Sequence, residues 1–257
     1  MKKIMSLLCV CVVALFVAAC SSSNSVDKIK KAGVLKAGVK EDVPKFGFLN
    51  PSTNKHEGFE IDLAELIAQK ILGDSSKIKF TGVTAKTRGP LLDTGELDIV
   101  AATFTITEER KKSYEFSDPY FTDGVGIMVK KSANINEFKD LNGKEVGVAQ
   151  SATTKKALQN AADAAGIKLK FSEYATYPDL KAALDSGRIS AFSVDKAILM
   201  GYMEDSVKLL NETFDAQEYG VTIKKGNTDL LQIVNGVIRD LVKSGEMDKL
   251  LKKHQLK

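Results

Sequence analysis

Hydrophobic residues follow two alternating patterns along this chain: short apolar runs, and longer segments in which apolar residues recur every three or four positions. The runs at 34–39 and 78–83 predict buried strands, whereas the second pattern predicts amphipathic helices. Segment 59–72 places its apolar side chains on one helical face, and Gly73 follows it as a typical end of a helix. Strands alternating with helices in this way predict a mainly parallel sheet covered by helices.

The same order of elements occurs twice. The first series comprises strands at 34–39, 78–83 and 98–103 with helices at 59–72 and 90–95, and the second comprises strands at 145–149, 168–171 and 190–194 with helices at 153–165 and 178–187. Segments 92–97 (LDTGEL) and 184–189 (LDSGRI) are also alike, although helix–glycine–strand junctions often are. The ordered match of five elements predicts two similar α/β lobes.

Two segments are suited to connect these lobes. Residues 117–124 lead into a strand at 125–129, and residues 215–219 lead back toward 220–223. If the amphipathic C-terminal helix packs on the first lobe, that lobe comprises 26–123 plus 219–257, and the second comprises 124–218. Two crossovers form a hinge, and open α/β sheets bind ligands at the carboxyl ends of their strands. We therefore expect the ligand site in a cleft between the lobes.

The N-terminus has the features of an export signal. Lys2 and Lys3 precede an apolar run at 4–19 that only Ser6 interrupts. As a helix this run would span about 24 Å, less than the ~30 Å hydrocarbon core of a membrane. It ends in Val-Ala-Ala before Cys20, which resembles a bacterial lipoprotein signal. This predicts a signal peptide at 1–19, lipidation of Cys20 and a tether at 20–25; an ordinary signal peptide and an uncleaved anchor helix are the alternatives.

Composition excludes several kinds of chemistry. Cys9 and Cys11 leave with the predicted signal, so the folded body has no thiol for a disulfide, a nucleophile or a metal cluster. The sequence has only two histidines, His56 and His254, and this small number argues against histidine catalysis and zinc sites. The formal charge is +4, from 37 basic and 33 acidic residues, and no basic run is interleaved with aromatic residues. These features argue against nucleic-acid binding, and we expect neither a metal nor a cofactor.

Several motifs identify a family. Segments 58–63 (GFEIDL), 103–110 (TFTITEER) followed by 116–120 (FSDPY), 148–154 (VAQSATT) and 194–195 (VD) resemble blocks of the family 3 extracytoplasmic solute-binding proteins, which serve ABC importers of polar amino acids. The resemblance covers essentially the whole mature chain. It implies the two-lobed type II periplasmic-binding-protein fold, an amino acid ligand and an ABC permease as partner. The implied location is the periplasm or the outer face of the cytoplasmic membrane.

One motif suggests how an amino acid is held. Thr105 and Glu108 have the spacing of a capping box, so a helix should begin after strand 98–103 and carry Arg110 in its first turn. Free backbone N–H groups and a guanidinium there would bind a carboxylate, although a solvated Arg110 is the alternative. The resemblance implies that Thr103, Thr105 and Arg110 bind the ligand α-carboxylate. It also implies that Thr153 joins them and that Asp195 accepts the α-ammonium.

Specificity for the ligand side chain is expected to rest on Lys40 and Arg88. Within the family the chain looks closest to aspartate and glutamate binders, some of them also described as surface adhesins, and Arg88 in 87–90 (TRGP) matches a segment of those binders. Arg110, Arg88 and Lys40 against Asp195 complement two carboxylates and one ammonium. A neutral ligand would leave excess buried positive charge, which is costly. The sequence therefore predicts an acidic amino acid, with another polar amino acid such as glutamine as the alternative.

The sequence leaves three alternatives to amino acid capture for import. A surface adhesin or a sensory receptor domain is compatible with a lipid tether, and a dehydratase-type enzyme occurs on the same fold. Catalysis would require an acid or base beyond the ligand clamp, so we expect no enzyme activity. No evident oligomerisation stripe is present, which predicts a monomer. Val43 stands where many relatives have an aromatic residue, leaving open whether Phe46 or Phe48 replaces it or the ligand needs none.

Overall fold

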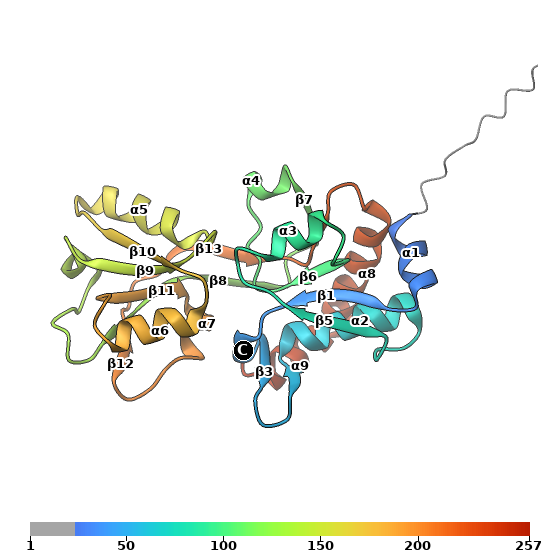
Figure 1. Ribbon diagram of the computed structural model, residues 1–257, viewed down its shortest axis with the longest axis horizontal. Helices are drawn as coiled ribbons and strands as arrows, with labels where there is room; N and C mark the ends of the chain where they lie inside the picture. The colour runs from blue at the N-terminus through green and yellow to red at the C-terminus, as the bar shows by residue number, and fades with distance from the viewer. Residues whose placement is uncertain (1–23) are drawn as a thin grey trace, which may run out of the picture.

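The apolar runs form two sheets that lie side by side, one in each lobe (Figure 1). The computed structural model describes residues 24–257. The sheet of lobe 1 has the order β5-β1-β6-β14-β7, with β1 (Leu35–Val39), β5 (Ile78–Gly82), β6 (Ile99–Ala101), β7 (Tyr114–Phe116) and β14 (Thr222–Lys224). The sheet of lobe 2 has the order β10-β9-β11-β8-β12 with β13 also paired to β8, comprising β8 (Phe121–Lys130), β9 (Glu145–Ala149), β10 (Lys170–Tyr174), β11 (Ala191–Asp195), β12 (Val207–Leu209) and β13 (Phe214–Tyr219).

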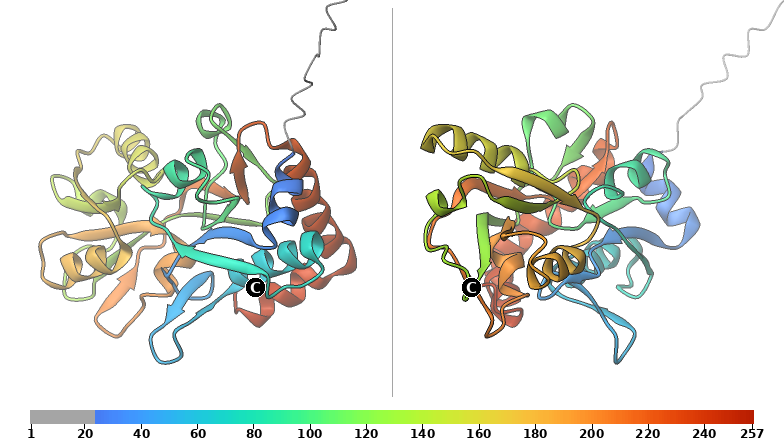
Figure 2. Two further views of the ribbon diagram at one scale, coloured as in Figure 1. Left: turned by 45° about the vertical axis from the view of Figure 1, so that its right-hand side comes forward. Right: turned by 60° about the vertical axis from the view of Figure 1, so that its left-hand side comes forward.

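Helices cover both sheets, as the alternating pattern predicts. Lobe 1 carries α1 (Ser25–Ala32), α2 (Phe59–Leu72), α3 (Arg88–Asp93), α4 (Glu108–Lys111), α8 (Thr228–Ser244) and α9 (Glu246–Lys253). Lobe 2 carries the 3₁₀ turn η1 (Phe138–Leu141), α5 (Thr154–Ala165), α6 (Tyr177–Asp185) and α7 (Lys196–Met200). The C-terminal α8 packs beside α1 and α2, so it returns to lobe 1 as expected (Figure 2).

The α/β fold class is confirmed, but the sheets are mixed. In lobe 1, β1 pairs in parallel with β5 and β6, and in lobe 2, β9 pairs in parallel with β10 and β11. The remaining pairs are antiparallel. The reason is that β8 and β13 run in opposite directions between the lobes and β14 follows directly from β13.

The connection between the lobes is a two-stranded ribbon. Strand β8 begins at Phe121, opposite Tyr219 of β13, whereas the sequence predicted its start at 125. The two crossing segments pair with each other, and this pairing extends β8 backward into the crossover. The lobe boundaries at 123–124 and 218–219 fall within this ribbon or at its end and stay a prediction.

A small third sheet was not predicted. Strands β2 (Asp42–Val43), β3 (Gly47–Asn50) and β4 (Lys55–Glu57) are two to four residues long and pair antiparallel. Segments this short carry no clear alternation, which explains why the sequence did not reveal them. The sheet matters because it follows β1 immediately and places Asp42 close to Lys40.

At the N-terminus, the predicted signal 1–19 and Cys20 lie outside the described residues. The last two residues of the predicted tether belong to the fold. The Asn24 side chain accepts a hydrogen bond from the Asp27 backbone and caps α1, and the Ser25 hydroxyl donates to Asp229 of α8 at 2.6 Å. Within residues 24–257, no helix has the length and apolar character needed to cross a membrane.

Candidate functional site

The carboxyl ends of β1 and β6 bring three predicted residues to one edge of the lobe 1 sheet. Val39 lies opposite Ala101 in the parallel register, so Lys40 and Thr103 emerge from neighbouring strand ends. Arg88, on α3, reaches the same place and donates to the Ala102 and Thr103 carbonyls at 2.5 and 3.1 Å. This edge faces lobe 2, where ligands are expected in an open α/β fold.

Arg88 is a buried cation with unused donors. The residue is 3% exposed, its guanidinium lies 3.8 Å from the Phe104 ring centroid, and its Nε has no hydrogen-bond partner among the described residues. Burial lowers its pKa, with the neighbouring Tyr177 and Glu60 opposing that effect. It makes no ion pair with any carboxylate of residues 24–257. The arginine that does form an ion pair in this part of the chain is Arg239, with Asp118. Arg88 therefore retains the capacity to bind an anion.

Arg110 joins the two lobes. It lies in α4, which is capped by the Thr107 side chain rather than by the predicted Thr105. Its guanidinium donates to the Thr105 carbonyl at 2.8 Å and to the Ser151 carbonyl of lobe 2 at 3.1 Å. Burial, followed by the charge of Arg88, lowers its pKa to about 9. Two cations thus converge beside Phe104 without a carboxylate partner in the described part of the chain.

Asp195 approaches the same place from lobe 2. It ends β11, is 4% exposed, and accepts a hydrogen bond from the Tyr219 hydroxyl at 2.5 Å. Burial raises its pKa to about 7, and the charges of Arg88 and Arg110 oppose that rise.

Thr153, the other site residue predicted in lobe 2 before α5, uses its hydroxyl elsewhere. The hydroxyl donates to Gln217 at 2.6 Å and makes no capping hydrogen bond to α5.

Lys40 is buried and already paired. Its Nζ lies 2.9 Å from Asp42 Oδ1 and 4.6 Å from the Tyr177 ring centroid. Burial lowers its pKa, and Asp42 opposes that effect. Asp42 also links the lobes: its Oδ2 accepts the Tyr177 N–H at 3.2 Å, and its carbonyl accepts the Tyr202 hydroxyl.

Glu60 is the second acidic group that the sequence did not single out for the site. It is fully buried, and its Oε1 accepts the Thr103 N–H at 2.6 Å and the Tyr120 hydroxyl at 2.5 Å. Its Oε2 has no hydrogen-bond partner in the described part of the chain, and burial raises the pKa of Glu60 to about 7. The sequence does carry a sign that Glu60 is buried, since it lies at helical spacing from the buried Ala64 and Ile67 on α2.

These two groups correct the predicted charge count. The sequence set Lys40, Arg88 and Arg110 against Asp195 alone. The structure adds Asp42 and Glu60, so three cations stand among three acidic groups. The motifs do not reveal these two acidic groups, because Asp42 on an adjacent turn and Glu60 on a packed helix reach the site only through folding.

Aromatic rings at the site also differ from the sequence alternatives. Phe46 belongs to the core, with its ring centroid 5.1 Å from Phe121, and Phe48 is half-buried in the small sheet. Phe104 and Tyr177 are the rings that lie against the site cations. The aromatic rings at the site thus come from Phe104 and Tyr177 rather than from Phe46 or Phe48.

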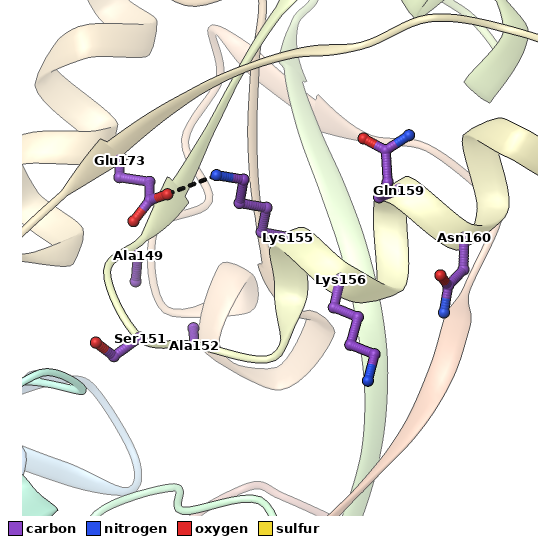
Figure 3. A pocket seen from close by; sticks show the side chains of 8 residues that line it. All are labelled: Ala149, Ser151, Ala152, Lys155, Lys156, Gln159, Asn160 and Glu173. Carbon is purple, nitrogen blue, oxygen red and sulfur yellow. Dashed lines mark hydrogen bonds and ion pairs between the residues drawn. The ribbon is translucent and has the colours of Figure 1, made fainter. Parts of the chain in front are cut away.

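A surface depression of about 570 Å³ lies next to this site on lobe 2 (Figure 3). It is lined by Ala149, Ser151, Ala152, Lys155, Lys156, Gln159, Asn160 and Glu173. Lys155 pairs with Glu173 at 2.8 Å, and both are substantially exposed. This composition is that of a solvated surface. Residues 24–257 contain no group of three or more histidine, cysteine or acidic side chains that could hold a metal ion.

Comparison with known proteins identifies the family. The family model described as "Bacterial extracellular solute-binding proteins, family 3" matches residues 35–257. A glutamine-binding protein of Geobacillus stearothermophilus is 43% identical over 78% of this chain and 76% of its own length. An ABC transporter glutamine-binding protein of Bacillus subtilis is 38% identical over 98% of this chain and 97% of its own. An L-glutamate/L-aspartate-binding protein of Pseudomonas aeruginosa is 30% identical over 90% and 80%.

Solved structures agree with the fold. A mutant of ArgBP from T. maritima superposes with a TM-score of 0.82 at 31% identity, covering 91% of this chain and all of that one. The two-lobed type II periplasmic-binding-protein fold is therefore confirmed. The relatives bear the names of binding proteins rather than enzymes, which agrees with the expectation of no catalytic activity.

Proposed function

Because this chain belongs to the family 3 bacterial extracellular solute-binding proteins, we propose that it captures one acidic amino acid between its lobes and delivers it to an ABC importer. The coarser part of this statement, amino acid binding outside the cytoplasm for an ABC importer, follows from the family. The preference for aspartate or glutamate is our inference from the site.

One observation carries the acidic preference: Arg88 and Arg110 converge without a carboxylate partner among the described residues. Neither guanidinium forms an ion pair with a described residue, and a guanidinium matches a carboxylate in a two-point hydrogen bond. Two guanidiniums therefore favour a ligand with two carboxylates. The unpartnered Nε of Arg88 supplies a donor for one of them.

Each predicted residue then has a role. Arg110 with Thr103, Thr105 and Thr153 binds the α-carboxylate, and Asp195 accepts the α-ammonium. Arg88 binds the side-chain carboxylate, and Lys40 adds a weaker attraction because Asp42 already compensates its charge. Lobe closure around the ligand would follow the ribbon of β8 and β13 as a hinge. The active form is a monomer held at the membrane by lipid on Cys20.

Glutamine is the second candidate, and two observations favour it. The relatives from Geobacillus stearothermophilus and Bacillus subtilis are named for glutamine. In addition, Asp42, Glu60 and Asp195 balance the three cations, and a balanced site suits a ligand without net charge.

Isothermal titration calorimetry against the twenty amino acids separates the candidates. We expect aspartate or glutamate to bind with a dissociation constant at least tenfold below that of asparagine or glutamine, with one ligand per chain. Tighter binding of glutamine than of either acid would overturn the acidic preference while leaving the family function intact. A stoichiometry of two would overturn the single site.

A further inference from the structure

Glu60 holds a buried negative charge close to the cations of the site but forms no ion pair with them. The ion pair of Lys40 is with Asp42, and Arg88 has none in the described chain. Yet Arg88 and Lys40 both act on Glu60 electrostatically, and its Oε2 has no hydrogen-bond partner within residues 24–257. The helix that carries Glu60 belongs to the lobe 1 core, so the fold fixes the position of this carboxyl group, which is ionised above its pKa of about 7.

The carboxylate of Glu60 is anchored to the segment that positions Arg88. Its Oε1 accepts the Thr103 N–H, and the Thr103 carbonyl accepts a hydrogen bond from Arg88. Thr103 has φ +46°, a left-handed conformation that is uncommon for a residue with a branched side chain. The hydrogen bond from the Thr103 N–H to Glu60 thus holds an unfavourable backbone conformation in place. It also keeps the Glu60 carboxyl group at a constant position relative to Arg88.

Glu60 and Asp195 both act electrostatically on Arg88. Under the proposed function Asp195 serves the α-ammonium, which every amino acid carries. Glu60 is left to compensate Arg88 when the ligand side chain is neutral, and to repel a side-chain carboxylate that arrives there. The charge of Glu60 therefore affects the difference in binding affinity between an acidic amino acid and its amide.

We infer that Glu60 is a specificity-determining residue, whose negative charge moderates the preference of the site for a ligand side-chain carboxylate over a carboxamide. This inference rests on the proposed placement of that side chain near Arg88. It requires no direct contact between Glu60 and the ligand, because two charges in a protein interior interact over several ångströms.

The substitution Glu60→Gln tests this inference in the full chain. Glutamine keeps an oxygen acceptor for Thr103 and Tyr120 but removes the charge. Calorimetry with L-glutamate and L-glutamine at pH 8, where Glu60 is ionised, gives the ratio of their dissociation constants, by displacement for the weaker ligand. We expect Glu60→Gln to shift this ratio toward glutamate by about tenfold. A shift below twofold, or one toward glutamine, would overturn the inference.

Glu65→Gln is the matched control. It makes the same change on the same helix, beside Asp62 and Lys253 rather than beside the site cations, so the ratio should stay within twofold of the wild-type value. A shift equal to that of Glu60→Gln would assign the effect to local structure and overturn the inference. The two proposals fail separately: the wild-type ratio tests the acidic preference, and the change in ratio on substitution tests the role of Glu60.

A second measurement covers the case in which Glu60→Gln does not fold. The groups facing Glu60 are Tyr120, Arg88 and Lys40, and burial raises the pKa of Glu60 itself to about 7. Protonation at pH 6 removes the charge as the substitution does. Asp195 titrates in the same range and also acts on Arg88, so its protonation shifts the ratio in the same direction as that of Glu60. The wild-type ratio should shift toward glutamate from pH 8 to pH 6, and a constant ratio would overturn the inference.

Discussion

The hydroxyl of Tyr219 donates a 2.5 Å hydrogen bond to the carboxylate of Asp195. Tyr219 ends β13, the strand that returns to lobe 1, and Asp195 ends β11 in lobe 2. The proposed acceptor for the ligand ammonium is thus fixed to one of the two strands that join the lobes. This contact connects ligand capture with the hinge and makes the protonation of Asp195 important for binding.

Binding of every amino acid should weaken as pH falls. Burial raises the pKa of Asp195 to about 7, and only its ionised form attracts an ammonium. Between pH 8 and pH 6 the ionised fraction of such a group falls about tenfold. Calorimetry with L-glutamine, whose side chain does not titrate, should show a comparable loss of affinity. An affinity that stays constant over this range would contradict the role of Asp195.

The same raised pKa affects stability without ligand. The folded protein binds the Asp195 proton more tightly than the unfolded chain, in which aspartate has a pKa of 3.8. Its stabilising contribution is therefore present at low pH and is lost as pH rises through about 7. We expect Asp195→Asn to raise the free energy of unfolding at pH 8 by about 2 kcal/mol, or about 4–8 °C in melting temperature, with a smaller gain at pH 5. Thermal melting at both pH values checks this, and an equal change at both would contradict it.

Loss of either α-group clamp should abolish binding of all amino acids. Arg110→Ala removes the guanidinium proposed for the α-carboxylate, and Asp195→Ala removes the acceptor for the α-ammonium. Truncating one member of a buried charged pair costs about 3–5 kcal/mol, which weakens binding by several hundred-fold or more. Titration with one acid and one amide should give similar losses for both. A loss confined to acids would show that Arg110 serves the side chain instead.

Arg88→Gln should weaken acidic ligands selectively. The substitution leaves the side-chain carboxylate of an acidic ligand without its cation. The neutral ligands asparagine and glutamine lose at most a hydrogen bond. We expect aspartate and glutamate to bind about a hundredfold more weakly, and the amides to change by less than tenfold. Equal losses would mean that Arg88 has a structural role, which its bonds to the Ala102 and Thr103 carbonyls also allow.

Lys40→Met should have a smaller selective effect than Arg88→Gln. Asp42 already pairs with Lys40, so the ligand gains only part of the lysine charge. We expect acidic ligands to bind about tenfold more weakly, and Asp42→Asn to strengthen them by freeing Lys40. Asp42→Asn also serves as a control for lobe contact, because asparagine can still accept from the Tyr177 N–H.

Cys20→Ser should release the protein from membranes without changing its ligand affinity. The multiple acyl chains of a lipoprotein hold stably, and their loss leaves no anchor of that kind. Membrane fractionation and calorimetry of the released protein provide the two measurements. A variant that still sediments with membranes after removal of the signal would contradict lipidation at Cys20.

The sequence by itself determined the α/β class, the order of the main strands and helices, and the motifs that name the family. Apolar periodicity, glycines after helices and short motif blocks are local properties, and local properties can be read along a chain. This is why the motifs alone point to Arg88, Arg110 and Asp195 as site residues. The two lobes followed from the repeated order of elements.

Tertiary structure alone decided the charge environment of the site. Asp42 reaches Lys40 through the short β2–β3 sheet, and Glu60 reaches Thr103 because α2 packs beneath the end of β6. The pairing of β8 with β13 likewise turned two predicted linkers into a ribbon. Electrostatic interactions depend on distance and burial rather than on separation along the chain, so the sequence identified the cations of the site but not the acidic groups that balance them.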